Sequence, residues 1–185
     1  MLKSKKKFSK IYDKNVERIY RFVFLKVDTQ ETAEDITSQV FIKAWKIIKK
    51  DSKQKEEIKN ISAYLYQIAR REIVNHYRGR AKIRTVSIES LQIKDTQTDL
   101  EKEKISQDEI GEMKKAISQL GDDYQNIIIW RHLDGLSYKK IAQITGKPEG
   151  TIRMINHRAL KELRGKMSGE VDKWTGGQVD KWTSE

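Results

Sequence analysis

The chain contains 185 residues, of which 37% are hydrophobic and none is cysteine. Disulfides and thiolate metal sites are therefore excluded, and the three histidines lie too far apart in the sequence to suggest a metal site. Lysine and arginine outnumber aspartate and glutamate by 38 to 27, which gives a net charge of +11. This excess favours a polyanionic partner, with nucleic acid as the first candidate, over a charge that only keeps the protein soluble.

No stretch of the sequence is long and apolar enough to cross a membrane. The longest apolar run is Ile127–Trp130, whereas a spanning helix needs about 20 such residues. The basic N-terminus is not followed by an apolar signal core. We therefore expect no membrane insertion and a cytoplasmic location.

The first 80 residues predict three helices. Apolar residues recur at helical spacing in residues 8–27, 30–49 and 61–78. The polar residues 50–60 predict a loop before the third helix. Gly79 follows that helix, at a position where a left-handed residue favours a helix end.

The periodicity fades after residue 80 and returns near Gln107. We interpret the stretch between as a linker. One helix follows and ends at Gly121. Asp122 and Asp123 begin the next helix, where negative charge favours the N-terminal end of the helix dipole, and this helix stops at Gly135.

Residues 136–164 carry the clearest local signal, a helix-turn-helix. Ser137 is suited to cap a short helix, Gly146 closes it, and Pro148 falls in the first turn of the next helix. Two helices joined in this way present the second helix to the DNA major groove. The alternative is an ordinary helical hairpin with a solvated basic face.

The outer face of the second helix has the chemistry of a DNA-reading surface. Arg153 matches a guanine edge, and Glu149 matches a cytosine amino group. Thr151 and backbone N–H groups suit phosphate. The predicted DNA contacts are Lys147, Glu149, Gly150, Thr151, Arg153, Met154, His157, Arg158 and Lys161.

Two motifs stand in order along the chain. Residues 33–45 read AEDITSQVFIKAW, and residues 135–142 read GLSYKKIA and are followed by PEGTIR at 148–153. They resemble the AED-x-x-Q-x-x-F-x-x-x-W helix and the region 4 helix-turn-helix of bacterial RNA polymerase sigma factors of the extracytoplasmic-function (ECF) type. The resemblance covers about residues 8–82 and 108–166.

The resemblance implies an all-α fold of two small helical domains. Residues 1–82 would form sigma region 2, and residues 108–166 would form sigma region 4, joined by a flexible linker at 83–107. The tail, 167–185, contains a duplicated Val-Asp-Lys-Trp-Thr. We interpret it as disordered, the alternative being a partner contact through its tryptophans.

The resemblance assigns core polymerase binding to the first motif. Asp35 and Gln39 are four residues apart on one helical face, off the apolar stripe and beside Lys43. Composition alone would favour a solvated face. The resemblance instead implies that this face docks on the clamp helices of the polymerase β′ subunit.

The third helix would melt and hold the −10 element. Aromatic faces stack unpaired bases and arginines hold phosphates, although Tyr64, Tyr66 and Tyr77 are better explained as packing residues. The chain departs from the family pattern at Arg71, where the family has Asn, and at Asn75, where it has Asp. The predicted −10 contacts are Arg70, Arg71, Asn75, Arg78 and Arg80.

The sequence therefore predicts a sigma factor that binds the β′ and β subunits of core RNA polymerase. Its region 4 would read the −35 element of promoter DNA. An anti-sigma partner is implied by the resemblance only. No phosphate loop, nucleophile–base pair or metal cluster suggests an enzyme, a cofactor or a metal. The alternatives are a regulator that binds duplex DNA without polymerase and a small nuclease using Asp122 and Asp123.

Overall fold

A computed structural model describes residues 2–54, 60–87 and 106–166, and this part of the chain consists of helices joined by short turns, without a strand. The N-terminal helices are α1 (Leu2–Phe24), α2 (Gln30–Gln54) and α3 (Ile61–Ser87). The C-terminal elements are α4 (Ser106–Ser118), α5 (Asp122–Ile128), a π-helical turn η1 (Ile129–Leu133), α6 (Tyr138–Thr145) and α7 (Glu149–Lys166). The predicted all-α fold is confirmed.

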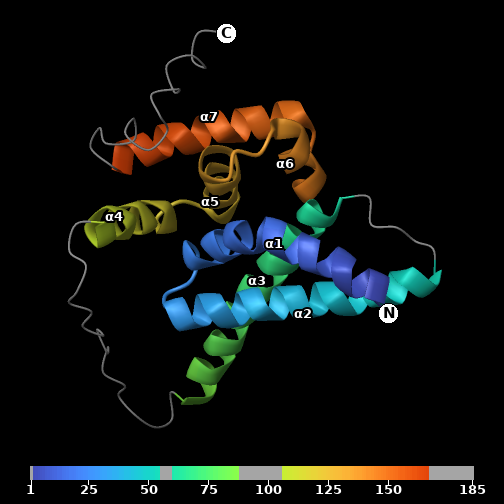
Figure 1. Cartoon of the computed structure of the whole chain (residues 1–185). Helices are drawn as coiled ribbons and strands as arrows, with labels where there is room; N and C mark the ends of the chain where they lie inside the picture. The colour runs from blue at the N-terminus through green and yellow to red at the C-terminus, as the bar shows by residue number, and fades with distance from the viewer. Residues whose placement is uncertain (1, 55–59, 88–105, 167–185) are drawn as a thin grey trace.

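The N-terminal unit is a three-helix bundle. Helices α1 and α2 lie alongside each other, and α3 crosses both (Figure 1). Its core contains Ile19, Val23, Val40 and Leu65, all almost completely buried. Thr29 starts α2, because its Oγ1 accepts a hydrogen bond from the Thr32 backbone N–H at 3.2 Å.

The C-terminal unit packs α7 against α5 and α6. Its core contains Ile127, Ile141, Ile152 and Leu160. The π-helical turn continues α5 directly and carries Trp130, which is completely buried. No helix in the described ranges is long and apolar enough to cross a membrane.

The two units pack on each other through aromatic side chains. The Trp130 ring stacks on Phe22 of α1, with centroids 5.5 Å apart and an interplanar angle of 16°. Tyr66 of α3 meets the same Trp130 ring edge-on at 5.7 Å. Helix α3 also contacts α6. The prediction of two small domains joined by a flexible linker did not include this contact. The central part of the predicted linker, 88–105, lies outside the described residues.

Several helix ends differ from the prediction, and α1 spans residues 2–24 rather than 8–27. Helix α2 continues through residue 54, so residues 50–54 are not a loop, and α3 runs through Gly79 to Ser87. Positive φ angles among the described glycines occur at Gly135 and Gly146, not at Gly79. The physical reason is that one glycine costs only about 1 kcal/mol in a helix and that polar residues such as lysine and glutamine are good helix formers. The predicted linker therefore loses residues 83–87 to α3 and residues 106–107 to α4.

Candidate nucleic-acid interface

The helix-turn-helix forms with the predicted end signals. Ser137 Oγ accepts a hydrogen bond from the Lys140 backbone N–H at 3.3 Å, and Gly146 closes α6 in the left-handed region with φ 74°. Pro148 lies just before α7 rather than within its first turn, and its carbonyl accepts the Ile152 N–H at 3.1 Å. These ends fix the angle at which α7 leaves the turn.

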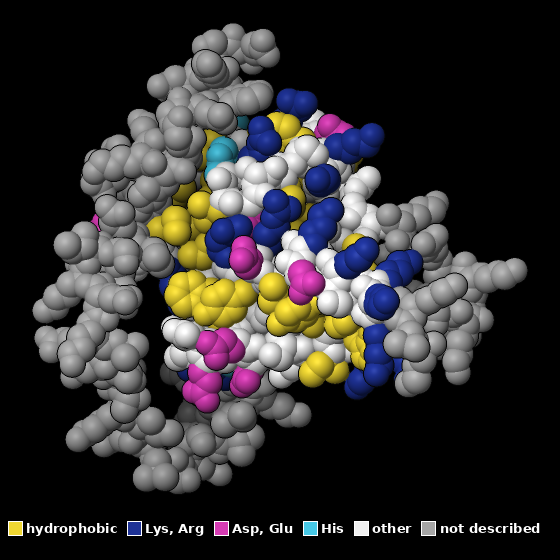
Figure 2. All heavy atoms as spheres, in the orientation of Figure 1, with side chains coloured by type: hydrophobic (Ala, Val, Ile, Leu, Met, Phe, Trp, Pro, Cys, Tyr) yellow, Lys and Arg dark blue, Asp and Glu magenta, His cyan; other side chains and the backbone are white. Residues whose placement is uncertain are grey.

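Most of the side chains predicted to contact DNA through α7 are on the surface. Lys147 and Thr151 are half-buried, and the exposed members are Glu149, Gly150, Arg153, Met154, His157, Arg158 and Lys161. Figure 2 shows Lys and Arg side chains spread over much of one face, from the region of α7 at the top toward the N-terminal end of α1. The surface is suited electrostatically to a nucleic-acid backbone.

Tyr138, the first residue of α6, lies at the centre of a polar network behind α7. Its hydroxyl oxygen accepts a hydrogen bond from Asn156 Nδ2 at 3.2 Å. Asn156 Oδ1 lies 2.9 Å from His132 Nε2. Burial lowers the pKa of the His132 imidazole, and the nearby Arg131 charge adds to this effect, although Asn156 opposes it. His132 is therefore neutral at pH 7.

The lowered pKa of His132 predicts a pH-dependent stability. Because the unfolded chain binds a proton on this imidazole more readily than the folded chain does, the free energy of unfolding should fall as the pH drops through about 6.5. Urea unfolding at pH 7.5 and 5.5 measures the loss. His132→Gln should lose less stability over this interval, and equal losses in the two proteins would show that His132 does not contribute.

Helix α3 does not bring the five predicted −10 contacts together on one free surface. Arg71, Asn75 and Arg78 are exposed. Arg80 pairs with Asp28 before α2. Arg70 faces the C-terminal unit and pairs with Asp122.

Arg70 is held by the start of α5. Its Nη2 lies 3.3 Å from an Asp122 oxygen and 3.8 Å from an Asp123 oxygen. Its guanidinium also lies 5.9 Å from the centroid of the Trp130 ring. Asp123 pairs in turn with Lys147 at the start of α7. The two aspartates thus bind Arg70, a predicted −10 contact, and Lys147, a predicted −35 contact.

Lys26 at the end of α1 is the third cation on this acidic pair. It contacts Asp122 and donates to Asn126 Oδ1 at 2.6 Å. Burial lowers the pKa of the Lys26 ammonium more than Asp122 raises it, because only 5% of the Lys26 side chain is exposed. Burial alone would raise the pKa of Asp122. The nearby Lys26 and Arg70 outweigh burial, so the pKa of Asp122 is lowered.

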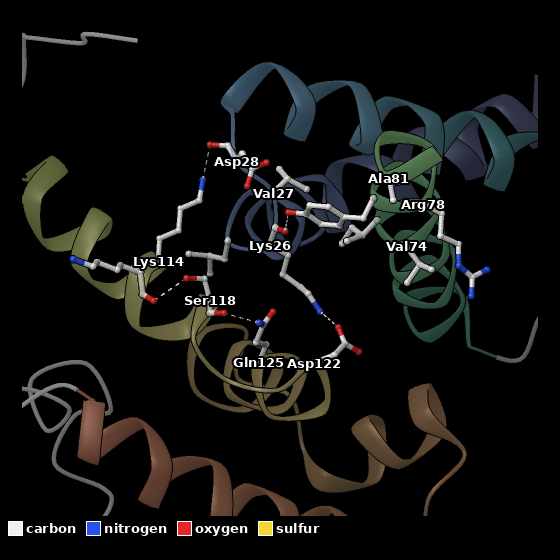
Figure 3. Close-up of a pocket in the computed structure, with 14 residues that line it drawn as sticks. Lys26, Val27, Asp28, Val74, Arg78, Ala81, Lys114, Ser118, Asp122 and Gln125 are labelled. Carbon is white, nitrogen blue, oxygen red and sulfur yellow. Dashed lines mark hydrogen bonds and ion pairs between the residues drawn. The ribbon is translucent and has the colours of Figure 1, made fainter. Parts of the chain in front are cut away.

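A groove of about 840 Å³ runs beside these contacts, between the two units (Figure 3). Its walls come from the turn after α1, from α3, from α4 and from α5. Tyr77 Oη donates to the Lys26 carbonyl at 2.8 Å across one side, and Lys114 Nζ donates to the Asp28 carbonyl at 3.4 Å across the other. Arg78, a predicted −10 contact, lines the groove.

A buried aspartate just after η1, Asp134, also joins the two units. Asp134 has no exposed side-chain surface, and its Oδ1 accepts from Arg21 Nε at 2.9 Å and Nη2 at 2.7 Å. Its Oδ2 accepts from Tyr66 Oη at 2.7 Å. Burial raises the pKa of Asp134 even though both donors oppose this, and burial together with Asp134 raises the pKa of Tyr66.

The tyrosines of α3 act mainly in packing. Tyr66 is buried in the contact between the two units, and Tyr64 packs against the hydrophobic core. Tyr77 is 40% exposed, but its hydroxyl is bound to the Lys26 carbonyl. The interpretation as packing residues is confirmed for Tyr64 and Tyr66.

The face of α2 predicted to dock on polymerase is free of other contacts. Asp35 and Gln39 are exposed, and neither has a hydrogen-bond or ion-pair partner in the part of the chain that the structure describes. Ile42, one further turn along the same face, is 54% exposed. Lys43 differs, because it pairs with the buried carboxylate of Glu72 on α3. Its contact within the protein makes it a structural residue as well as a predicted docking residue.

Comparison with known proteins decides the family. The family model described as Sigma-70 region 2 matches residues 11–83, and the model described as Sigma-70, region 4 matches residues 110–163. ECF RNA polymerase sigma factor BldN of Streptomyces coelicolor is 27% identical over 157 residues, 84% of this chain and 58% of BldN. RNA polymerase sigma factor SigV of Bacillus subtilis is 29% identical over 154 residues, 82% of this chain and 85% of SigV. The chain belongs to the sigma-70 family, as an ECF-type sigma factor.

Two solved structures share the fold. RpoE of Bartonella quintana, solved with the anti-sigma factor NepR, superposes with a TM-score of 0.67 at 23% identity over 89% of this chain and 99% of RpoE. CnrH, solved with the cytosolic domain of CnrY, gives a TM-score of 0.66 at 12% identity over 90% of each chain. At these sequence identities, the similarity supports only the fold of this sigma factor.

Several residues that shape the site of this sigma factor were not predicted. Asp134 is paired with Arg21, 113 positions away in the sequence, and no local pattern indicates such a pair. Phe22 was not placed in the α1 stripe, because it faces Trp130 in the other unit rather than α2. Asp122 and Asp123 were predicted to start a helix, which is confirmed, but their role in binding cations of both units was not. No group of three or more potential metal ligands occurs within the described segments.

Proposed function

We propose that this sigma factor binds core RNA polymerase through the Asp35–Gln39 face of α2, melts the −10 element with α3 and reads the −35 element with α7. The observation that carries the proposal is the exposed, basic outer face of α7, presented by a capped helix-turn-helix in a chain that matches both sigma-70 regions. The unpartnered Asp35 and Gln39 support the docking step. On this proposal the protein performs no covalent chemistry and acts where polymerase acts, in the cytoplasm.

The arrangement of the two units adds a requirement to this function. Arg70 and Lys147 are bound to Asp122 and Asp123. A phosphate can take over these cations only if the aspartates release them, so the Arg70 and Lys147 side chains must leave Asp122 and Asp123 when DNA binds. We include an anti-sigma factor among the proposed partners, since the sigma factor RpoE, which shares the fold, was solved with one.

Transcription in vitro tests the proposal. Purified core polymerase should start at specific promoters only when this protein is added. Binding of the free protein to promoter DNA should be weak without core polymerase. Tight, sequence-specific binding by the free protein, with no redirected transcription, would instead support a stand-alone regulator.

Arg153→Ala tests the assignment of the −35 reading. An arginine that forks onto one guanine contributes about 1–3 kcal/mol of discrimination against the wrong base. The variant holoenzyme should therefore lose roughly tenfold discrimination at one −35 base pair and keep it at the others. Competition binding with promoters changed at single −35 positions measures this loss. A uniform loss on all sequences would identify Arg153 as a phosphate contact.

A further inference from the structure

The ring of Tyr138 lies against the arginine predicted to read the −35 element. The guanidinium carbon of Arg153 is 4.7 Å from the Tyr138 ring centroid, well inside the range of a cation–π contact. Arg153 has no ion-pair or hydrogen-bond partner in residues 2–54, 60–87 and 106–166. The ring is therefore the contact that orders this exposed side chain in the free protein.

The ring is itself fixed from behind. The Tyr138 hydroxyl oxygen accepts from Asn156 Nδ2. Since that amide nitrogen donates to Tyr138, the Asn156 carbonyl oxygen must accept from His132 Nε2, so the neutral imidazole carries its hydrogen on Nε2. Asn156 is only 5% exposed. The ring is thus tied to α7 and η1 as well as to its own helix.

A second arginine, Arg131, contacts the same ring. The Arg131 guanidinium is also 4.7 Å from the Tyr138 centroid, and its Nη1 donates to the Leu136 carbonyl at 3.2 Å. Arg131 is anchored by this bond and Arg153 is not. An incoming acceptor can therefore draw Arg153 from the ring more easily than Arg131, because Arg131 would also have to give up its bond to Leu136.

We propose that Tyr138 is a positioning residue for −35 recognition, because its ring holds the Arg153 guanidinium ordered and exposed before DNA arrives. The inference rests on the proposed function and adds a residue outside the predicted DNA-contacting set. An ordered guanidinium loses less rotamer freedom on binding a base than a free one. The benefit should thus appear as discrimination at the base pair that Arg153 reads.

The test compares two substitutions of Tyr138 in the polymerase holoenzyme. Tyr138→Phe keeps the ring and removes the hydroxyl, and Tyr138→Leu removes the ring. A −35 library selected with wild-type holoenzyme first gives the preferred sequence, and competition with single-base changes then measures discrimination. Tyr138→Leu should lose discrimination about two- to fivefold at the base pair that Arg153 reads, whereas Tyr138→Phe should retain it. The salt dependence of binding should be unchanged in both, because no phosphate contact is removed.

A double variant separates positioning from packing. In the Arg153→Ala background, Tyr138→Leu should cause no further loss of discrimination, because the residue it positions is absent. Ile144→Val, a mild change in the buried face of α6, controls for lost stability and should leave discrimination unchanged. Thermal unfolding checks that each variant is folded.

Three results would overturn the inference. They are unchanged discrimination in Tyr138→Leu, an equal loss in Tyr138→Phe, and a further loss in the double variant. Each of these results is informative only when the wild-type holoenzyme prefers one −35 sequence. A wild-type protein that directs no promoter-specific transcription would instead reject the proposed function, and the inference with it.

Discussion

Asp134→Ala is expected to lower the free energy of unfolding by about 3 kcal/mol and to loosen the contact between the two units. The substitution leaves the Tyr66 hydroxyl buried without its partner and removes two charge-assisted hydrogen bonds from Arg21. An unsatisfied buried polar group costs about 1–3 kcal/mol, and a hydrogen bond to a charged group contributes about as much. Urea unfolding followed by circular dichroism measures the difference.

A matched control uses another aspartate that pairs with an arginine. Asp28 and Arg80 are both more than half exposed, so Asp28→Ala should lower the free energy of unfolding by no more than about 1 kcal/mol. Trp130 fluorescence provides a second readout, since loosening of the Phe22 stack exposes the indole to water. Equal effects of Asp134→Ala and Asp28→Ala would show that the buried carboxylate is not important for joining the units.

The double substitution Asp35→Ala with Gln39→Ala should weaken binding to core polymerase at least tenfold without unfolding the protein. Truncation of a hot-spot residue near the centre of an interface costs about 2 kcal/mol or more, and we expect Asp35 and Gln39 together to reach at least this value. Both side chains are exposed and have no hydrogen-bond or ion-pair partner in the described part of the chain, so their removal should leave the melting temperature unchanged. Fluorescence anisotropy of the labelled protein, titrated with core polymerase, measures the affinity.

Glu34→Ala is the matched control for this prediction. Glu34 is an exposed acid on the same helix, where Gln30 donates to it at 2.8 Å, and it lies about 100° around the helix axis from Asp35. Its removal should leave the affinity for polymerase unchanged. If the double variant bound core polymerase as tightly as the wild type, the docking face would have to lie elsewhere on the molecule.

The sequence predicted the features that depend on near neighbours in the chain. Helical spacing of apolar residues located most of the helices, and Ser137 and Gly146 gave the ends of α6, because caps act within one turn. Helix ends at residue 54 and residue 87 were missed, since neither a polar composition nor a single glycine is enough to stop a helix.

The contact between the two units was not predictable in the same way. It depends on Phe22 of α1, on Tyr66 of α3, and on Trp130 and Asp134 in and just after η1. Trp130 reads as an ordinary core residue of its own helix, and Asp134 beside Gly135 reads as a turn. Only the folded chain shows that both face the other unit. The predicted DNA contact Arg70 was located on the correct helix, but its pairing with Asp122 depends on the same long-range contact.

The acidic start of α5 has a consequence for how DNA affinity responds to ionic strength. A protein cation that displaces a condensed counterion from DNA normally makes the affinity fall as salt is added. Arg70 and Lys147 begin with aspartates as their counterions, so the added salt also weakens the internal pairs that DNA must replace. These two cations should therefore contribute less to the salt dependence than free arginines and lysines, and the holoenzyme should tolerate salt better than a count of its basic residues would suggest.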